Sequence, residues 1–323
     1  MEPSPRNQTI RLCDEDRERL RPHLMRVEPG ESLPMESIQD AVIPGDFFAL
    51  VEQLPAACVD LLFVDPPYNL NKQFGDQTFR QMSLTDYAEW LDDWLGRARR
   101  LLKPDASIYI CGDWRSSSAI HMVCEKHFIV QNRITFEREK GRGARNGWKN
   151  SSEDIWFCTM SRNYYFDAEA VKLKRRVIAP YRLNGVPRDW QAAPDGSNYR
   201  MTYPSNLWTD ITVPFWSMPE NTPHPNQKSE KLMAKLLLAS SRPGDLVLDP
   251  FAGAGTTGAA AFKLGRRFTL VEIEEEYCLY ALRRLEMARE SGRIQGYSEG
   301  VFWERNAFSR ATGQARAKNM RSA

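Results

Sequence analysis

The sequence predicts an α/β protein with one large domain, because short apolar runs alternate with segments of helical periodicity along most of the chain. The runs with the length and composition of buried strands are residues 59–64, 106–111, 128–136, 154–160, 246–249 and 268–272. Apolar side chains recur at helical spacing over residues 84–102, 116–127, 229–241 and 274–289. Two of the strands end in turns of unusual composition, and open α/β sheets bind their ligands at that end of their strands.

Composition sets the protein apart from several classes. With 323 residues, the chain can bury a full core in a single domain. Its 44 basic and 42 acidic residues nearly balance, so a surface for nucleic acid must come from local clustering. No apolar run approaches the roughly 18 residues that span a membrane, and the N-terminus lacks the pattern of a signal peptide. The six cysteines are scattered and form no metal-binding pair, so we expect a soluble cytoplasmic protein without metal or disulfides.

The chain begins with a charged, proline-rich segment, residues 1–38, which we predict to be an N-terminal arm that packs on the domain or on a partner. A strand over residues 38–43 is predicted to end at Pro44-Gly45-Asp46, and a short helix follows. Asp46 has the position of a helix N-cap. Because it lies just before the central strand in the sequence, a second role facing a ligand is also open.

Residues 59–69 read V-D-L-L-F-V-D-P-P-Y-N, and we interpret them as the central strand and a functional turn. Pro66 and Pro67 have fixed φ angles and donate no hydrogen bond, so the carbonyls before them are expected to face outward on a stiff turn. Together with Asp65 and Tyr68, the turn offers a carboxylate, a carbonyl and an aromatic face. This set suits a planar ring with an exocyclic NH2 group. A strand that simply ends in a turn is the alternative.

The polar segment 69–81 is predicted to be a loop over a pocket, and Ser83 has the position of a helix start. Basic and aromatic residues cluster further on, in residues 133–149 and 171–188, the second of which has six Lys or Arg and no acid. Such clusters are typical of surfaces that bind phosphates and bases, and a solvated loop is the alternative. The candidate DNA contacts are Arg142, Arg145, Lys149, Lys174, Arg175, Arg176 and Arg182.

A glycine-rich turn follows the strand 246–249 and opens a helix; its glycines are Gly253, Gly255 and Gly258. Glu272 follows the first glycine by nineteen residues, and this pattern fits an NAD-dependent oxidoreductase. A P-loop is excluded, because it would require a Gly-Lys-Ser/Thr sequence after the glycines. Two features disfavour NAD: the turn comes late in the chain, and Asp249 and Pro250 precede it. Acids at the turn and after the next strand suit a cationic ligand with a ribose, such as S-adenosylmethionine.

The two turns together resemble those of the amino-methyltransferases of restriction–modification and orphan DNA-methylation systems. The D-P-P-Y motif precedes the glycine motif, an order that resembles their β group, and the similarity extends over roughly residues 41–285. Shared segments are Gly45-Asp46, His224-Pro-Asn-Gln-Lys228 and Glu276-Tyr277. The chain departs from the family pattern at Phe136, Asn226 and Ser229.

The resemblance implies a Rossmann-like, S-adenosylmethionine-dependent methyltransferase fold that is circularly permuted, with a mixed sheet of about seven strands. It implies a catalytic domain over residues 39–290 that contains a target-recognition insertion, residues 161–220. Composition, and not the resemblance, predicts a basic C-terminal tail over residues 291–323. The implied catalytic residues are Asp65, Pro66, Pro67 and Tyr68. The implied cofactor-binding residues are Asp46, Lys228, Asp249, Phe251, Gly253, Gly255, Thr256 and Glu272.

The activity that the resemblance implies is transfer of a methyl group to the N6 atom of a flipped-out adenine in double-stranded DNA, without a metal. Family members that act on cytosine more often have Ser where this chain has Asp65, which favours adenine. Methylation of RNA or protein is a further alternative, disfavoured because such relatives usually have the glycine motif first. The resemblance also implies association with the nucleoid and allows a homodimer.

Overall fold

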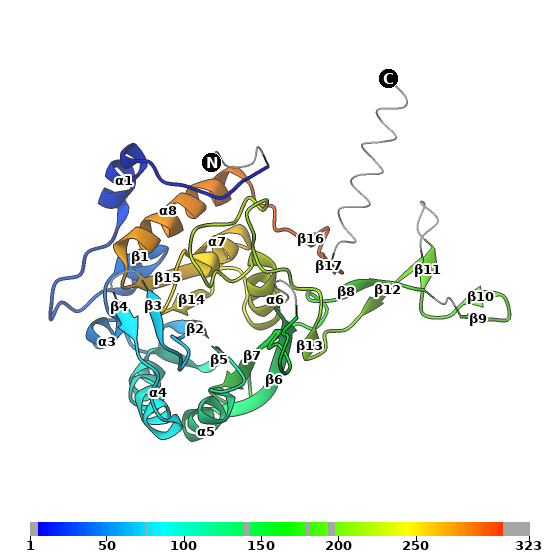
Figure 1. The fold of residues 1–323 in the computed structure, drawn as a ribbon, viewed down its shortest axis with the longest axis horizontal. Coiled ribbons are helices and arrows are strands. Elements are labelled where there is room, and N and C mark those ends of the chain that lie inside the picture. The colour runs from blue at the N-terminus through cyan, green and yellow to red at the C-terminus, as the bar shows by residue number, and fades with distance from the viewer. Residues whose placement is uncertain (1–5, 75–76, 139–142, 179–180, 193–197, 306–323) are drawn as a thin grey trace.

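An eight-stranded mixed sheet runs through the centre of the protein in the order β1-β15-β14-β2-β5-β7-β6-β13 (Figure 1). The computed structural model describes residues 6–74, 77–138, 143–178, 181–192 and 198–305. The strands are β1 Ala41–Pro44, β2 Val59–Val64, β5 Leu102–Gly112, β6 Ile129–Glu137, β7 Ser152–Thr159, β13 Leu207–Trp208, β14 Leu246–Asp249 and β15 Arg267–Glu272. β7 is antiparallel to both neighbours, and the other pairs are parallel. The two-residue β13 at the edge makes eight strands where about seven were expected.

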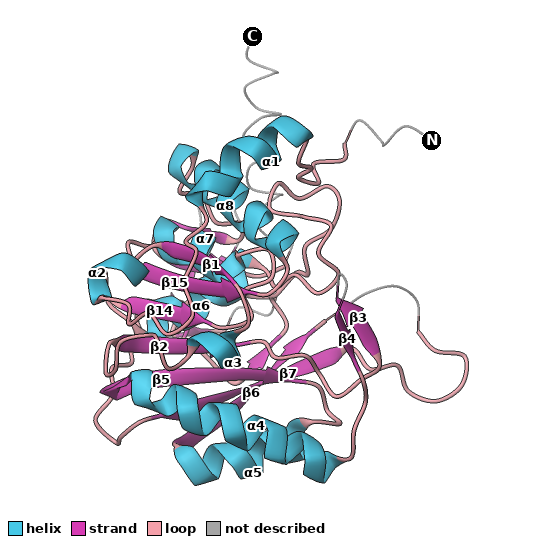
Figure 2. Ribbon diagram, turned by 90° about the vertical axis from the view of Figure 1, so that its left-hand side faces the viewer, coloured by secondary structure: helices cyan, strands magenta, loops and turns pink. Residues whose placement is uncertain are grey.

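Helices cover both faces of this sheet because the central strands are apolar on both sides (Figure 2). The main helices are α3 Phe47–Leu50, α4 Leu84–Ala98, α5 Ser117–His127, α6 Glu230–Ser240, α7 Thr256–Lys263 and α8 Glu275–Glu290. In β2, Leu62 and Val64 belong to the core under α4 and α5, whereas Leu61 and Phe63 belong to the core under α6, α7 and α8. Fully burying one such side chain stabilises the fold by about 1.5–3 kcal/mol. None of the helices in the described ranges has the length and apolar composition needed to cross a bilayer.

Local sequence signals set the starts of several elements. Asp46 caps α3 by accepting a hydrogen bond from the Phe48 amide at 3.0 Å, and Ser83 caps α4 in the same manner. The strand predicted over residues 38–43 begins instead at Ala41, because Met35–Ile38 form the short helix α2. The predicted loop 69–81 contains a hairpin, β3 Lys72–Phe74 and β4 Gln77–Phe79. Two hydrogen bonds of 2.8 Å between Asn69 and Met82 close its base.

The N-terminal arm packs on the helical layer that contains α6, α7 and α8. Its helix α1, Asp14–Leu20, lies beside α8 (Figure 1). Four apolar side chains of the arm belong to the core under α8: Ile10, Leu12, Leu20 and Leu24. The Arg17 guanidinium pairs with the Glu276 carboxylate at 2.9 Å. The arm thus contacts the domain itself, one of the two outcomes that the sequence left open.

A second, five-stranded sheet projects from the body and is called the projecting sheet below (Figure 1). Its strands, in spatial order, are β11 Gln191–Ala192, β12 Asn198–Thr202, β8 Leu173–Arg176, β17 Val301–Trp303 and β16 Tyr297–Ser298. A small hairpin of β9 Arg182–Leu183 and β10 Val186–Pro187 extends beyond it. The start of the predicted C-terminal tail therefore forms two strands, since β17 pairs with β8 through Phe302 and Leu173. Residues 306–323 lie outside the described residues.

Two glycines of the glycine-rich turn are required by packing, whatever the ligand. Gly255 has φ +73°, and a Cβ atom there would lie 2.4 Å from the Cβ and 2.7 Å from the Cα of Ala281 in α8. A Cβ atom on Gly258 would lie 2.6 Å from Leu270 Cδ1 in β15. Contacts this short cannot be accommodated without a shift of the neighbouring residues, so these glycines allow α7 to approach both neighbours closely.

We expect Gly255→Ala to lower the free energy of unfolding by about 2–4 kcal/mol, because it combines a left-handed backbone with overpacking. Chemical denaturation measures the change. Gly244→Ala is the matched control, since Gly244 has φ +88° but no atom within 4 Å of the added Cβ. Equal losses in the two variants would contradict the close approach of α7 to α8.

Candidate active site

The two motifs predicted from the sequence meet at one edge of the sheet. β14 pairs in parallel with β2, with Val247 beside Leu61 and Leu248 beside Leu62. The turns that follow these strands therefore lie next to each other, which brings together Asp65 and Asp249. β15 and β1 continue this edge, where Pro44 is paired with Glu272 and is followed by Asp46. Four acidic residues that were predicted separately thus line the carboxyl ends of four adjacent parallel strands.

Asp65 belongs to a buried cluster of charged side chains. The Lys228 ammonium lies 2.6 Å from Asp65 Oδ2 and 3.5 Å from Glu153 Oε2. The Tyr68 hydroxyl lies 3.0 Å from Asp65 Oδ1 and 3.2 Å from Glu153 Oε2, and its single proton can be donated to only one of them at a time. Arg138, which follows β6, pairs with the other oxygen of Glu153. The side chains of Glu153 and Lys228 are only 3% and 10% exposed, so this cluster is shielded from water.

Mutual attraction keeps the buried members of the cluster charged. Burial alone would raise the pKa of Glu153, but Lys228 and Arg138 outweigh it and hold that pKa below its usual value. Burial would lower the pKa of Lys228, yet the nearby carboxylates of Asp65 and Glu153 raise it above the ordinary range. Burial, reinforced by the same two carboxylates, raises the pKa of Tyr68 well above its ordinary value. Tyr68 therefore stays a neutral hydroxyl between two carboxylates.

The glycine-rich turn is held by the acids around it. Glu272 accepts hydrogen bonds from the amides of Gly253 at 2.8 Å and Glu274 at 3.0 Å, and burial raises its pKa. Asp249 accepts from the Phe251 amide at 3.1 Å and from the Thr257 hydroxyl. Burial raises the pKa of Asp249 to about 7.

These carboxyl groups fit a ligand with a cationic centre and ribose hydroxyls, because they offer hydrogen-bond acceptors at a turn that has little side-chain bulk. A nearby cation would also favour their charged forms. The other predicted cofactor residues are more varied. Phe251 packs its ring edge-on against Trp94, with the ring centres 5.5 Å apart. Lys228 was expected beside the cofactor, but its ammonium is bound to Asp65. In the described ranges, no group of three or more His, Cys, Asp or Glu side chains is arranged to hold a metal ion.

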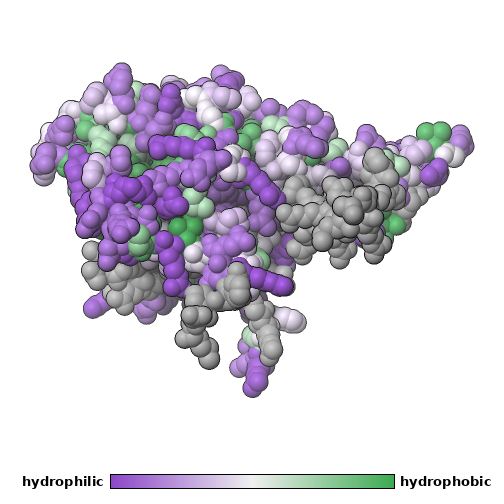
Figure 3. Space-filling model, turned by 90° about the horizontal axis from the view of Figure 1, so that it is seen from above, coloured by the Kyte–Doolittle hydropathy of each residue, from purple (hydrophilic) through white to green (hydrophobic). Residues whose placement is uncertain are grey.

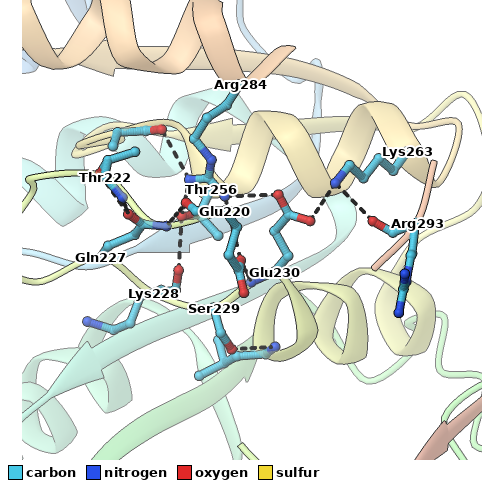
Figure 4. A network of polar contacts seen from close by, with 12 residues as sticks. Glu220, Thr222, Gln227, Lys228, Ser229, Glu230, Thr256, Lys263, Arg284 and Arg293 are labelled. Carbon is cyan, nitrogen blue, oxygen red and sulfur yellow. Dashed lines mark hydrogen bonds and ion pairs between the residues drawn. The ribbon is translucent and has the colours of Figure 1, made fainter. Parts of the chain in front are cut away.

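Arg284 of α8 ties the glycine-rich turn to the segment that carries Lys228 (Figure 4). Its guanidinium donates to the Ala254 carbonyl at 3.1 Å and to the Thr256 hydroxyl at 2.7 Å. The Thr256 hydroxyl in turn donates to the Lys228 carbonyl at 3.1 Å. Thr256, predicted as a cofactor residue, therefore fixes the backbone of Lys228. Sequence reasoning did not find Arg284, because nothing local distinguishes it from the other arginines of its helix.

The same guanidinium lies against a pair of buried acids (Figure 4). Arg284 Nη2 is 3.0 Å from Glu230 Oε1 and 3.8 Å from Glu220 Oε2, and the Lys263 ammonium is 2.6 Å from Glu230 Oε2. Glu220 also accepts a hydrogen bond from the Glu230 amide at 2.9 Å. Burial, and then the charge of Glu230, raise the pKa of Glu220 to about 7, although Arg284 acts in the opposite direction.

This shift predicts a pH dependence of stability. Glu220 holds its proton to higher pH in the folded chain than its ordinary value of 4.5, so its contribution is complete below that value and is lost as the pH rises through about 7. The free energy of unfolding should therefore fall between about pH 5 and pH 8, by on the order of 3 kcal/mol from this group. Glu220→Gln, which is uncharged at every pH, should flatten the fall in urea denaturation.

The exposed Glu18→Gln change is the control for that measurement and should leave the pH slope unchanged. Asp249 titrates in the same direction in every variant, so the difference between wild type and Glu220→Gln isolates Glu220. An unchanged slope in Glu220→Gln would show that this carboxyl is already ionised at pH 5.

The predicted DNA-contact residues are spread over two regions. Arg142 lies outside the described residues, and Arg145 and Lys149 lie in the segment 143–151. In β8, the Lys174 ammonium contacts the rings of Tyr199 and Trp303, at 4.0 and 4.3 Å from their centres. The other four predicted residues are in the projecting sheet and its hairpin: Lys174, Arg175 and Arg176 in β8, and Arg182 in β9.

Consecutive residues of a strand point to opposite faces, so the three basic residues of β8 do not share one surface. Lys174 and Arg176 are on the face that carries Tyr199, which is paired with Arg176. Arg175 is on the other face, with its Nε atom 4.0 Å from the Glu304 carboxylate. Figure 3 shows hydrophobic side chains at the end of the projection, where Leu183 and Val186 of the hairpin are 52% and 65% exposed.

Fold and site together define an α/β protein of the Rossmann-like methyltransferase class. A family model described as DNA methylase matches residues 59–283, and the chain belongs to that family. The DNA adenine methyltransferase YhdJ of Escherichia coli (strain K12) is 35% identical over 254 residues, which are 76% of this chain and 83% of that protein.

Solved structures show the same fold. The PvuII DNA methyltransferase, described as cytosine-N4-specific, matches with a TM-score of 0.56 and 17% identity over 77% of this chain and 90% of that one. TTHA0409 of Thermus thermophilus, a putative DNA modification methylase solved in complex with S-adenosyl-L-methionine, matches with a TM-score of 0.50 and 22% identity over 82% of this chain and 98% of that one.

Proposed function

We propose that this protein transfers a methyl group from S-adenosylmethionine to the N6 atom of adenine in double-stranded DNA. The observation that carries the proposal is the position of Asp65, a carboxylate on a stiff proline turn directly beside the glycine-rich turn that follows β14. Membership of the DNA methylase family and the relative named as an adenine methyltransferase support it.

The proline turn acts on the amine of the target base. Asp65 and the Pro66 carbonyl accept its two hydrogens, so the nitrogen pyramidalises and its lone pair points outward. The Tyr87 hydroxyl donates to the Pro67 carbonyl at 3.2 Å and helps to fix the turn. A positioned amine reacts as if in a unimolecular step, which contributes several kcal/mol to catalysis, or about 7–11 kcal/mol at best. A stacked base must first be flipped out of the duplex at a cost of a few kcal/mol, and stacking on the Tyr68 ring offsets about 1–3 kcal/mol of it.

The acids beyond β14, β15 and β1 hold the methyl donor. When bound, S-adenosylmethionine would supply an electrophilic methyl group on a sulfonium centre. As the amine nitrogen forms its bond to the methyl carbon, the carbon–sulfur bond breaks, a neutral thioether leaves, and the nitrogen loses one proton to solvent, directly or through Asp65. Glu272 would accept hydrogen bonds from the ribose hydroxyls, and Asp46 would hold the adenine end of the cofactor. The glycine-rich turn accommodates the methionine part, and Asp249 keeps that turn in shape through its bonds to Phe251 and Thr257.

The product identifies the target base. Enzyme is incubated with labelled S-adenosylmethionine and unmethylated genomic DNA, the DNA is digested, and the nucleosides are separated. We expect label in N6-methyldeoxyadenosine, and Asp65→Asn should lower its formation by about a hundredfold or more, because a preorganised acceptor is lost. Binding of S-adenosylmethionine to the variant, measured by calorimetry, should stay within about tenfold, since Asp65 is not part of the glycine-rich turn. Label in N4-methyldeoxycytidine would refute the choice of base, and wild-type turnover by Asp65→Asn would refute the catalytic role.

DNA binding is assigned to the insertion 161–220, and in particular to the face of the projecting sheet with Lys174, Arg176 and Tyr199. Basic side chains interleaved with rings on one flat face suit phosphates and unstacked bases. Arg175 lies on the opposite face near Glu304, which offsets its charge. We also propose that the protein forms a homodimer, and light scattering would measure its mass in solution.

Neutralising the proposed face should change the salt dependence of DNA binding. We expect Lys174→Gln with Arg176→Gln to reduce the slope of log affinity against log salt by about 0.9 for each lost phosphate contact. The matched control is Arg175→Gln, which removes a neighbouring charge from the other face and should leave the slope close to that of the wild type. If Arg175→Gln flattens the slope as much as the double variant does, the proposed face is not the specific DNA-binding surface.

A further inference from the structure

Both oxygens of the proposed amine acceptor are already engaged by the protein itself. The Lys228 ammonium lies 2.6 Å from Asp65 Oδ2, and the Tyr68 hydroxyl lies 3.0 Å from Asp65 Oδ1. An entering amine competes poorly with an ammonium at that distance, because the ammonium adds the attraction of a full positive charge for the carboxylate, whereas the amine is neutral. The ammonium is therefore the group that an entering amine would have to displace from Asp65 Oδ2.

Glu153 offers the ammonium a second place. Its Oε2 atom lies 3.5 Å from Lys228 Nζ, and its other oxygen is held by Arg138. Its side chain is 3% exposed, and its backbone is fixed in β7 by pairing with Phe136 of β6. A buried carboxylate that is charged and rigidly placed, with one oxygen directed at the lysine, is an acceptor ready to take the ammonium in full.

The lysine can make this move without disturbing the rest of the site. Its backbone is fixed, since its carbonyl accepts a hydrogen bond from the Thr256 hydroxyl at 3.1 Å. An ammonium on a four-carbon stem has three rotatable donors, so a small rotation of the end of the side chain exchanges one carboxylate for another. The ammonium stays paired throughout, which matters because an unpaired buried charge is strongly unfavourable.

We infer that Lys228 takes the place of the target amine on Asp65 while no base is bound, and passes to Glu153 when the amine enters. This inference rests on the proposed function, which supplies the amine. Lys228 and Glu153 are thus positioning residues that control access to the catalytic carboxylate. The move also takes a positive charge away from Asp65 when positive charge develops on the amine nitrogen during methyl transfer.

A double-mutant cycle tests the exchange of Lys228 between the two carboxylates. Glu153 can speed the reaction by receiving the ammonium only if Lys228 is present. The variants are Lys228→Met, Glu153→Gln and their combination, and the readout is the single-turnover rate of methyl incorporation into unmethylated genomic DNA at saturating S-adenosylmethionine. We expect Glu153→Gln to slow the wild-type background by about tenfold or more, since the ammonium then stays on Asp65. In the Lys228→Met background the same change should cost no more than about threefold.

A binding measurement complements the rates. With S-adenosylhomocysteine present, the affinity for the same DNA should drop on Glu153→Gln only when Lys228 is intact. Glu137→Gln is the matched control: Glu137 is on the neighbouring strand β6, pairs with Arg305 at 3.4 Å and is 38% exposed. It should have the same small effect in both backgrounds.

Folding is checked for each variant by thermal unfolding and by binding of S-adenosylmethionine. If Lys228→Met does not fold, Lys228→Arg replaces it, because a rigid guanidinium keeps the charge but cannot exchange in the same manner, so Glu153→Gln should again add little. Equal effects of Glu153→Gln in the two backgrounds would overturn the exchange while leaving the proposed function intact. A wild-type protein that forms no methyladenine would instead show that the proposed function is wrong.

Discussion

The parallel pairing of β14 with β2 is the constraint on which the rest of the site depends. These strands are separated by most of the sequence, yet they lie together at the centre of the sheet, with Val247 beside Leu61. Both strands are buried on both faces, so a shift of register would expose apolar side chains or bury the turns. The core thus decides where the proline turn and the glycine-rich turn lie relative to each other. The chemistry of the site follows from a distance that packing sets.

Buried charge is the second constraint, because this edge of the sheet carries many acids in little space. Basic side chains pair with four of them in two connected clusters. In one, Lys228 and Arg138 face Asp65 and Glu153; in the other, Arg284 and Lys263 face Glu230 and Glu220. The Thr256 hydroxyl joins the two clusters by accepting from Arg284 and donating to the Lys228 carbonyl. Removing one member of a buried pair costs more than the pair contributes, so such clusters fix geometry more than they add stability.

Sequence patterns predicted the main helices, both turns and the strands of the central sheet other than β13, because these depend on local signals. They did not predict the strands of the projecting sheet. The apolar run of β2, the prolines after it, the cap at Ser83 and the glycines before α7 are all properties of neighbouring residues. Glu153 and Arg138 were missed for the opposite reason. Glu153 and Tyr68 are 85 residues apart in the sequence, and they become neighbours only through the antiparallel pairing of β7 with β5. A weak signal was present, since Glu153 and Asp154 are acids that enter an otherwise apolar strand.

Lys228 shows that the place of a residue in the chain does not fix the partner of a long side chain. The family resemblance implies a place beside the cofactor, and the Lys228 backbone is held next to the glycine-rich turn by Thr256. The side chain, however, is long enough to reach the carboxylate at the next strand end. An acceptor designed for a neutral amine would be a buried, unpaired carboxylate whenever the site is empty, and such a group destabilises the fold unless something neutralises it. A lysine on a flexible stem solves this conflict between stability and function, because it can fill the acceptor without closing it permanently. The need to neutralise Asp65 arises only when no base is bound. The D-P-P-Y motif, which is fitted to the bound base, therefore gives no indication of the lysine that meets this need.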